Sequence, residues 1–291
     1  MKIENLIGNT PLVKIEQMSK HKNVAIYCKL EGQNPGGSVK DRPALGMITG
    51  ALERGDIKPG DKLVEATSGN TGIALAMIAA YKKLDLTLIM PEGATQERIK
   101  SMRAFGAKLI LTPKEKTIEY SRVLAEKMAA EEGYFILNQF SNPDNYLMHE
   151  KTTGPEIWRD TSEKVTHFVS AMGTTGTIMG VSRYLKSKNP EIQIVGTQPT
   201  DGSSIPGIRR WSPDFLPEIF DPKRVDRIVD VSEQEATAIT RRMAKEEGIF
   251  AGMSSGGALF AALKVAQELD NGTIVCITCD RGDRYLSSEL F

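Results

Sequence analysis

The sequence predicts an α/β protein whose sheets are largely parallel and covered by helices on both faces. Short apolar, β-branched runs alternate with longer stretches of helical period along its 291 residues, and Gly, Pro, Asn or Asp separates most of them. Helices between strands supply the crossover connections that parallel pairing requires. Apolar residues make up 40% of the chain and charged residues 25%, which is ordinary for a packed globular protein.

The predicted strands are short apolar runs, most of them bounded by turn-forming residues. In chain order they are Val24–Leu30, Lys62–Glu65, Leu86–Met90, Lys108–Leu111, Phe135–Leu137, Val165–Ser170, Ile192–Gly196 and Thr273–Thr278. The predicted helices are longer segments in which apolar residues recur at helical spacing. They are Val39–Glu53, Thr71–Tyr81, Gln96–Ala104, Glu115–Glu131, Thr175–Lys186, Glu233–Glu246 and Gly256–Glu268.

Two α/β units with a cleft between them are expected. The chain is about twice the common domain length, and Asn142–Asn145 separates one strand and helix series from another. The segment Pro199–Asp226 fits neither pattern because it carries five prolines, and a loop of that length is usually functional or mobile. Sites in such folds lie at the carboxyl ends of strands, so the loops that follow the strands are the candidates.

Charge and hydropathy argue against nucleic acid and membrane as partners. Thirty-seven Lys and Arg balance thirty-seven Asp and Glu, so no global field attracts phosphate backbones or anionic lipid. No uncharged run approaches the roughly 20 residues of a membrane span, and the N-terminus has no apolar signal core. We therefore expect a cytoplasmic protein.

The cysteines and histidines do not predict a disulfide or metal site. Cys28, Cys276 and Cys279 form an odd set that fits a reducing compartment. A redox or zinc reading of Cys276-x-x-Cys279 is disfavoured, because the segment reads as a strand in which residues three apart face opposite ways. The three histidines are far apart in sequence and lack metal-ligand spacing, so no metal is expected.

Lys40 is the first catalytic candidate. It lies in Asn34–Arg42, where a glycine-rich loop leads into a helix that Ser38 could cap. An ammonium at a helix N-terminus opposes the macrodipole, which could lower the pKa of the amine as a nucleophile requires. The competing interpretation is a solvated lysine paired with Asp41.

Three further loops join a strand or turn to a helix and carry small hydroxyl residues and glycines. They are Glu65–Gly72, Ser170–Thr177 and Gly252–Gly257. Exposed N–H groups and hydroxyls at a helix start can bind a carboxylate or phosphate, but ordinary helix capping, for example by Ser68 or Thr71, uses the same atoms. The hypothesis of a phosphate-binding loop is strongest for Ser170–Thr177, because Gly173 and Gly176 allow the backbone to approach a ligand closely. It matches neither the Walker nor the dinucleotide fingerprint.

The candidates are one lysine, one loop suited to bind a phosphate and one loop suited to bind a carboxylate. The sequence shows no metal site and no conventional acid–base pair beside them. This combination indicates that a cofactor carries the chemistry. Pyridoxal 5′-phosphate requires a lysine for its Schiff base, a helix start for its phosphate, and a seat for the carboxylate of an amino-acid substrate. Each requirement has a candidate in this sequence.

The sequence resembles the β-family (fold type II) of pyridoxal-phosphate enzymes and, within it, the cysteine synthases or O-acetylserine sulfhydrylases. The motifs that carry the resemblance are Ile7–Leu12, Pro35–Arg42, Thr67–Gly72, Gln139–Pro143, Gly173–Thr177 and Ser254–Gly257. Two more segments, Asp201–Trp211 and Cys279–Leu286, resemble the B-type branch of that family. The resemblance spans nearly the whole chain.

The resemblance implies a fold of two three-layer αβα domains with mainly parallel twisted sheets and the cofactor in the cleft between them. We expect residues 1–12 and 35–143 to form a smaller, mobile domain, and residues 13–34 and 144–291 to form a larger one. A homodimer is expected on the same ground.

The resemblance also implies residue roles. Lys40 is the Schiff-base lysine, Asn70 contacts the cofactor's ring oxygen, and Ser254 contacts the pyridine nitrogen. The phosphate loop comprises Gly173, Thr174, Thr175, Gly176 and Thr177. The residues similar to those that bind the substrate carboxylate are Thr67, Ser68, Thr71 and Gln139.

The implied reaction is formation of L-cysteine from O-acetyl-L-serine and sulfide, in a ping-pong sequence through a bound aminoacrylate, with Lys40 removing the α-proton. Arg209, Arg210 and Cys279 suggest that thiosulfate is also accepted, giving S-sulfocysteine, although a solvated arginine pair is the plainer interpretation. Two alternatives stay open. One is a serine or threonine dehydratase of the same fold, and the other is a non-catalytic binding protein.

Overall fold

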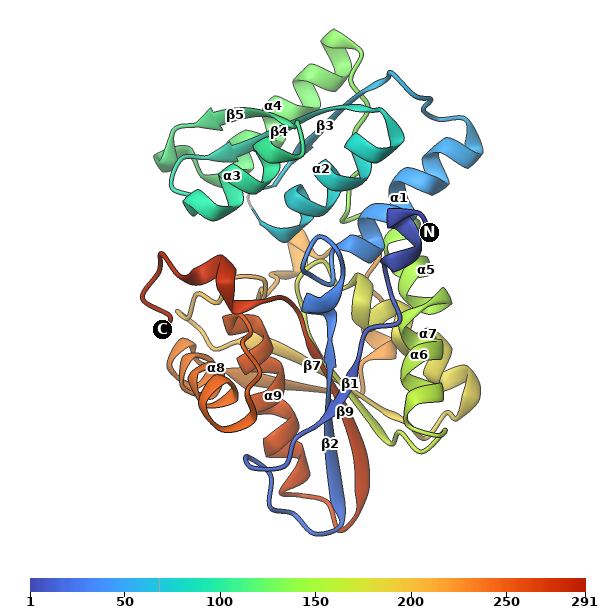
Figure 1. Cartoon of the computed structure of the whole chain (residues 1–291), viewed down its shortest axis with the longest axis vertical. Helices are drawn as coiled ribbons and strands as arrows, with labels where there is room; N and C mark the ends of the chain where they lie inside the picture. The colour runs from blue at the N-terminus through green and yellow to red at the C-terminus, as the bar shows by residue number, and fades with distance from the viewer. Residues whose placement is uncertain (68) are drawn as a thin grey trace.

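Two β-sheets organise the chain, and they lie one above the other in Figure 1, a computed structural model that describes residues 1–67 and 69–291. The larger sheet has the strand order β1-β2-β9-β6-β7-β8 and the smaller has the order β3-β4-β5. Their bounds are β1 Leu12–Lys14, β2 Val24–Leu30, β3 Lys62–Ala66, β4 Asp85–Pro91, β5 Lys108–Thr112, β6 His167–Ala171, β7 Gln193–Pro199, β8 Arg227–Val231 and β9 Gly272–Thr278. Among the described residues, neighbouring strands pair in parallel except β1 with β2.

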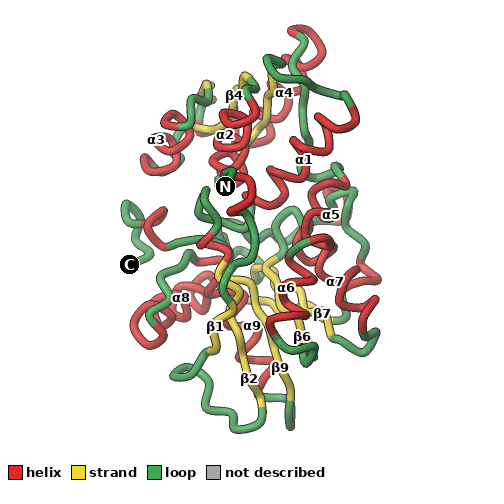
Figure 2. The backbone as a smooth tube through the Cα atoms, turned by 45° about the vertical axis from the view of Figure 1, so that its right-hand side comes forward, coloured by secondary structure: helices red, strands yellow, loops and turns green. Residues whose placement is uncertain are grey.

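Helices cover both faces of both sheets, as the sequence predicts. Their bounds are α1 Asp41–Arg54, α2 Asn70–Lys82, α3 Gln96–Ala104, α4 Thr117–Glu132, α5 Pro143–Lys151, α6 Thr153–Asp160, α7 Gly176–Lys188, α8 Glu233–Glu247 and α9 Met253–Ala266. Figure 2 shows α5, α6 and α7 on one side of the larger sheet, with α8 and α9 toward the other. The three-layer α/β fold is confirmed.

Separate apolar cores fill the layers. In the smaller unit, one core joins α1 and α2 to β3 and β4, and a second packs α4 against the opposite face. In the larger unit, α8 and α9 bury one face of the sheet, while α6 and α7 bury the other. Strands buried on both faces read as continuous apolar runs, which is why they were recognisable in the sequence.

Several predicted elements differ from the structure. Phe135–Leu137 is not a strand, because only Phe135 forms an isolated bridge, to Leu63, before Asn138 turns with a φ of 51°. The sequence pattern did not reveal β1, β8, α5 or α6. The segment 142–145, expected as a divide between units, contains the start of α5, which the sequence pattern did not reveal, and the Asn142 side chain accepts a hydrogen bond from the Asp144 N–H at 3.0 Å.

Candidate active site

The loops that carry Lys40, Asn70 and Gly173–Thr177 converge because each follows the carboxyl end of a strand. In the larger sheet, β2, β6 and β9 are parallel, so the loops after them leave one edge of that sheet. The loop after β3 leads into α2 of the smaller unit and meets that edge, since a hydrogen bond joins Asn70 to Asp280. Ser68, predicted to bind substrate, lies outside the described residues.

Lys40 occupies the N-cap position of α1 and is partly buried. Burial lowers the pKa of its amine, and the neighbouring Cys279 and Asp280 oppose that shift. The pKa is lowered, as the sequence predicted, and burial is its chief cause. Pairing with Asp41 is not what holds this segment: the Asp41 carboxylate accepts the Gly36 N–H at 2.5 Å, and burial raises its pKa to about 7.

The loop before α7 has the features of an anion site. Thr175 holds a φ of 72° at the N-cap, and its buried hydroxyl has no partner among the described residues. A Cβ on Gly176 would lie 1.9 Å from Asn145 Oδ1, so only glycine fits there. Backbone N–H groups at the start of α7 and a free threonine hydroxyl are suitable donors for a phosphate. The residues present therefore fit the phosphate of the expected cofactor.

The proline-rich segment after β7 braces this loop. The Arg209 N–H donates to the Met172 carbonyl at 2.8 Å, and Trp211 Nε1 donates to the Gly173 carbonyl at 2.8 Å. A Cβ on Gly173 would lie 2.8 Å from the Gly207 carbonyl oxygen, which shows how closely the two backbones approach. The segment that fitted neither helix nor strand is thus part of the site wall.

Ser254 and Cys279 lie beside Lys40. Ser254 is 4% exposed near the start of α9, and its hydroxyl hydrogen-bonds the Cys279 thiol. Burial raises the pKa of that thiol to about 11, so Cys279 is protonated near neutral pH. A neutral, compact side chain at this position lines the site without adding charge to it.

The predicted carboxylate residues are linked to the phosphate loop. The Thr71 hydroxyl donates to Gln139 Oε1 at 2.9 Å. Asn145 Nδ2 donates both to the Gln139 carbonyl at 2.7 Å and to Thr174 Oγ1 at 3.2 Å. Thr67 is buried at the end of β3. The structure therefore brings Thr71, Gln139 and the phosphate loop together through Asn145, a residue that the sequence analysis did not identify.

A second group that the sequence analysis missed surrounds Asn70. Asn70 Nδ2 donates to Asp280 Oδ2 at 2.7 Å, and Asn70 Oδ1 accepts a hydrogen bond from Arg284. Tyr285 also donates to Asp280 Oδ2, at 2.6 Å. The sequence signal that could have identified Asp280, Arg284 and Tyr285 is that they closely follow Cys279, at the end of a buried strand.

The two arginines predicted to bind a second substrate are placed differently. Arg210 is paired with the carboxylates of Asp201 at 3.2 Å and Asp230 at 2.7 Å, and both of these carboxylates are exposed. The Arg209 guanidinium lies over the Trp211 ring, 5.3 Å from its centroid. Trp211 contacts the phosphate loop at Gly173, so Arg209 is linked to that loop through the Trp211 ring.

The described residues form neither a metal-binding cluster nor a membrane-length apolar helix. Across the described ranges 1–67 and 69–291, no group of three or more His, Cys, Asp or Glu side chains is arranged to hold a metal ion. Within the same ranges, none of the helices has both the length and the apolar character needed to cross a bilayer.

Comparison with known proteins gives consistent matches over the whole chain. The family model described as "Pyridoxal-phosphate dependent enzyme" matches residues 3–280. Cysteine synthase B of Pseudomonas aeruginosa is 58% identical over 289 residues, covering 99% of this chain and 97% of that protein. Cysteine synthase B of Escherichia coli is 54% identical, covering 99% and 95%. The solved cysteine synthase of Entamoeba histolytica is 39% identical with a TM-score of 0.95, covering 100% of this chain and 90% of that one.

Proposed function

The chain belongs to the pyridoxal-phosphate dependent enzymes, and on that premise we propose that it forms L-cysteine from O-acetyl-L-serine and sulfide. The observation that carries the proposal is the partly buried Lys40 with a lowered pKa, which shares one edge of the larger sheet with an anion-binding helix start. Pyridoxal phosphate, when bound, supplies the electron sink that allows the α-proton and the β-acetoxy group to leave.

The chain's own residues divide the remaining tasks. The N–H groups of Gly173–Thr177 and the Thr175 hydroxyl bind the phosphate, Ser254 contacts the pyridine nitrogen, and Asn70 contacts the ring oxygen. A serine hydroxyl does not hold that nitrogen protonated, which favours elimination of the β-substituent over transamination. Thr67, Thr71 and Gln139 bind the substrate carboxylate.

Lys40 has two roles in this proposal. It is the point of covalent attachment of the cofactor, and its amine, once free, takes the α-proton of the substrate. A lowered pKa serves both roles because the neutral amine is the nucleophile and the base. Release of acetate before sulfide binds makes the kinetics ping-pong.

Thiosulfate is proposed as a second sulfur donor. An arginine at the site wall can hold a doubly charged anion through charge-assisted hydrogen bonds, and the small Cys279 leaves room beside the substrate. Of the two candidates, Arg209 fits this role better, because the carboxylates of Asp201 and Asp230 already occupy Arg210.

The Lys40→Ala variant tests the proposal. Cysteine formation should be lost while the thermal unfolding midpoint is unchanged, and borohydride should fix the cofactor to the Lys40 peptide of the wild type only. Turnover of the variant within about tenfold of wild type contradicts the assignment.

Product analysis tests the dehydratase alternative. A wild-type enzyme that makes pyruvate whether or not sulfide is present is a dehydratase.

We place the enzyme in the cytoplasm as a homodimer, an expectation supported by its family resemblance and by its reduced cysteines. Cys28 and Cys276 face each other across β2 and β9 with Sγ atoms 3.5 Å apart, and both are free thiols. Sedimentation equilibrium of the purified protein measures the assembly state.

A further inference from the structure

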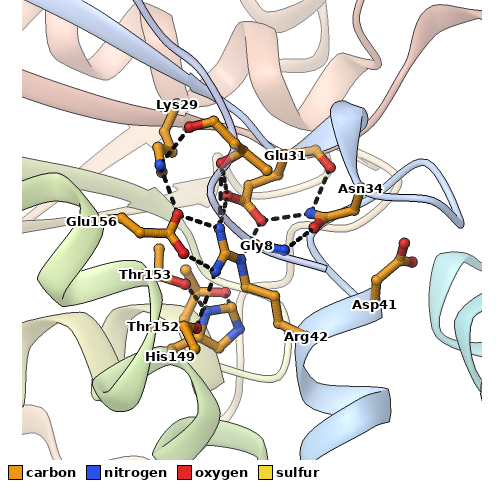
Figure 3. A network of polar contacts seen from close by, with 12 residues as sticks. Gly8, Lys29, Glu31, Asn34, Asp41, Arg42, His149, Thr152, Thr153 and Glu156 are labelled. Carbon is orange, nitrogen blue, oxygen red and sulfur yellow. Dashed lines mark hydrogen bonds and ion pairs between the residues drawn. The ribbon is translucent and has the colours of Figure 1, made fainter. Parts of the chain in front are cut away.

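A buried cluster of charged residues surrounds Arg42 at the start of α1, directly after the loop that carries Lys40 (Figure 3). At its centre Arg42, fully buried, makes two-pronged contacts with two carboxylates. Its Nε and Nη2 donate to Glu31 at 2.7 and 2.8 Å, and its Nη1 and Nη2 donate to Glu156 at 2.7 and 2.8 Å. Thr152 Oγ1 accepts a further hydrogen bond from Nη1 at 3.0 Å. Hydrogen bonds to the two carboxylates therefore fix the orientation of the guanidinium from two sides.

Both ends of the Lys40 loop are tied to the same carboxylate. Glu31 follows β2, and its Oε2 accepts two hydrogen bonds. One comes from Arg42, after Lys40 in the sequence, and the other comes from Asn34 Nδ2, before Lys40, at 2.9 Å. Asn34 Nδ2 also lies 3.2 Å from the Ser38 carbonyl, two residues from Lys40. One buried side chain of the larger unit thus holds the segment 34–42 at both of its ends.

The cluster also joins the two units at the start of α1. Beyond Arg42, α1 packs into the core of the smaller unit through residues such as Ala44 and Met47. Glu31 and Glu156, which hold Arg42, belong to the layers of the larger unit, where Lys29 Nζ adds an ion pair to Glu156 at 2.8 Å. The first turn of α1 is accordingly anchored to the larger unit, although the rest of the helix belongs to the smaller one.

Stability alone does not account for this arrangement. Removing ions from water costs several kcal/mol each, and apolar replacements of a buried ion cluster are often neutral or stabilising for folding. Glu156 remains ionised at neutral pH: burial raises its pKa, but Arg42 and Lys29 outweigh that effect and hold the pKa at about 2. What the two-pronged geometry adds is direction, because a planar guanidinium between two carboxylates admits one orientation.

We propose that Arg42, held by Glu31 and Glu156, is a positioning residue that fixes Lys40 for covalent attachment of the cofactor. The inference rests on the proposed function, in which the Lys40 amine condenses with the cofactor aldehyde, a C=N bond forms and water leaves. Because a misplacement of about 1 Å can slow a reaction by about 100-fold, a small shift of the loop slows attachment. Phosphate binding depends on Gly173–Thr177, which the cluster does not include.

The test compares covalent and non-covalent binding to the apo-protein. Wild type and Arg42→Lys are mixed with pyridoxal phosphate, and the rate of attachment is followed by absorbance. They are also titrated with 4′-deoxypyridoxine 5′-phosphate, which has the same ring and phosphate but no aldehyde. We expect Arg42→Lys to slow attachment by about tenfold or more and to leave the affinity for the analogue within about twofold. An equal loss of both, or no loss of either, overturns the inference.

Two further variants keep the result interpretable. Glu156→Gln preserves shape while removing one carboxylate charge, and it should slow attachment without changing analogue affinity; it decides the question if Arg42→Lys does not fold. Met243, a fully buried residue of α8, lies outside the site, and Met243→Ala is a matched destabilised control expected to change neither rate nor affinity. A wild type that forms no covalent attachment refutes the proposed function itself, whereas normal attachment in the folded cluster variants refutes only the positioning role.

Discussion

Asn70 at the start of α2 donates through Nδ2 to Asp280 Oδ2 at 2.7 Å, although the two residues are 210 positions apart in the sequence. One belongs to the smaller unit and the other follows the last strand of the larger sheet. The hydrogen bond therefore spans the two units beside Lys40, and the same Asp280 oxygen accepts from Tyr285 at 2.6 Å. Asp280 thus connects the proposed cofactor-contacting amide to the C-terminal segment.

Tyr285→Phe should lower the free energy of unfolding by about 2 kcal/mol, because a buried carboxylate loses one of its donors. Urea denaturation of the cofactor-free protein measures the change. Tyr81→Phe, at a tyrosine that is 38% exposed, is the control and should stay within about 0.5 kcal/mol of wild type. Equal losses in both variants would mean that the contact with Asp280 contributes nothing particular.

Gln139→Ala and Thr71→Ala should slow acetate release from O-acetyl-L-serine in single-turnover experiments by about tenfold, the cost of losing one hydrogen bond to a charged carboxylate. Cofactor affinity should be unchanged, because the Asn145 contact to residue 139 uses the backbone carbonyl. If only cofactor affinity changes, the two residues belong to the cofactor site.

Arg209→Ala should raise the KM for thiosulfate by about tenfold and leave the kinetics with sulfide unchanged, since only the doubly charged donor requires the cation. Arg210→Ala is the matched control, because that side chain is paired with Asp201 and Asp230. Steady-state rates with both donors decide the matter. A wild type that uses thiosulfate poorly, or two variants that behave alike, contradicts the prediction.

Glu65→Gln should flatten the pH dependence of stability. Burial raises the pKa of Glu65 to about 7 from 4.5, so the folded state binds the proton more tightly than the unfolded state. The corresponding stability is complete below about pH 4.5 and is lost as pH rises through about 7, on the order of 3 kcal/mol in total. Unfolding free energies at pH 5 and 8 check this: the wild type should lose more between them than the variant, and parallel curves would show that Glu65 titrates normally.

The alternation of strands and helices was predictable from the sequence because it is encoded locally. A buried parallel strand such as β4 is an apolar run, and an amphipathic helix such as α8 carries its own period and its own Ser232 capping box. Lys40 and the loop from Gly173 to Thr177 were also visible as candidates, because each lies in a glycine-rich segment at the start of a helix, although such segments can also serve only as helix caps.

Strand pairing and residues distant in sequence were decided only by the tertiary structure. Phe135 has strand-like neighbours but forms just one bridge, because a strand exists only where a partner edge accepts it. The short helix α5 takes its stability from packing on α7 rather than from its own period. Asn145 and Arg42 look like ordinary polar residues in the sequence. Their roles depend on burial, which converts a weak surface contact into a fixed geometry and requires the whole chain to exclude water from it.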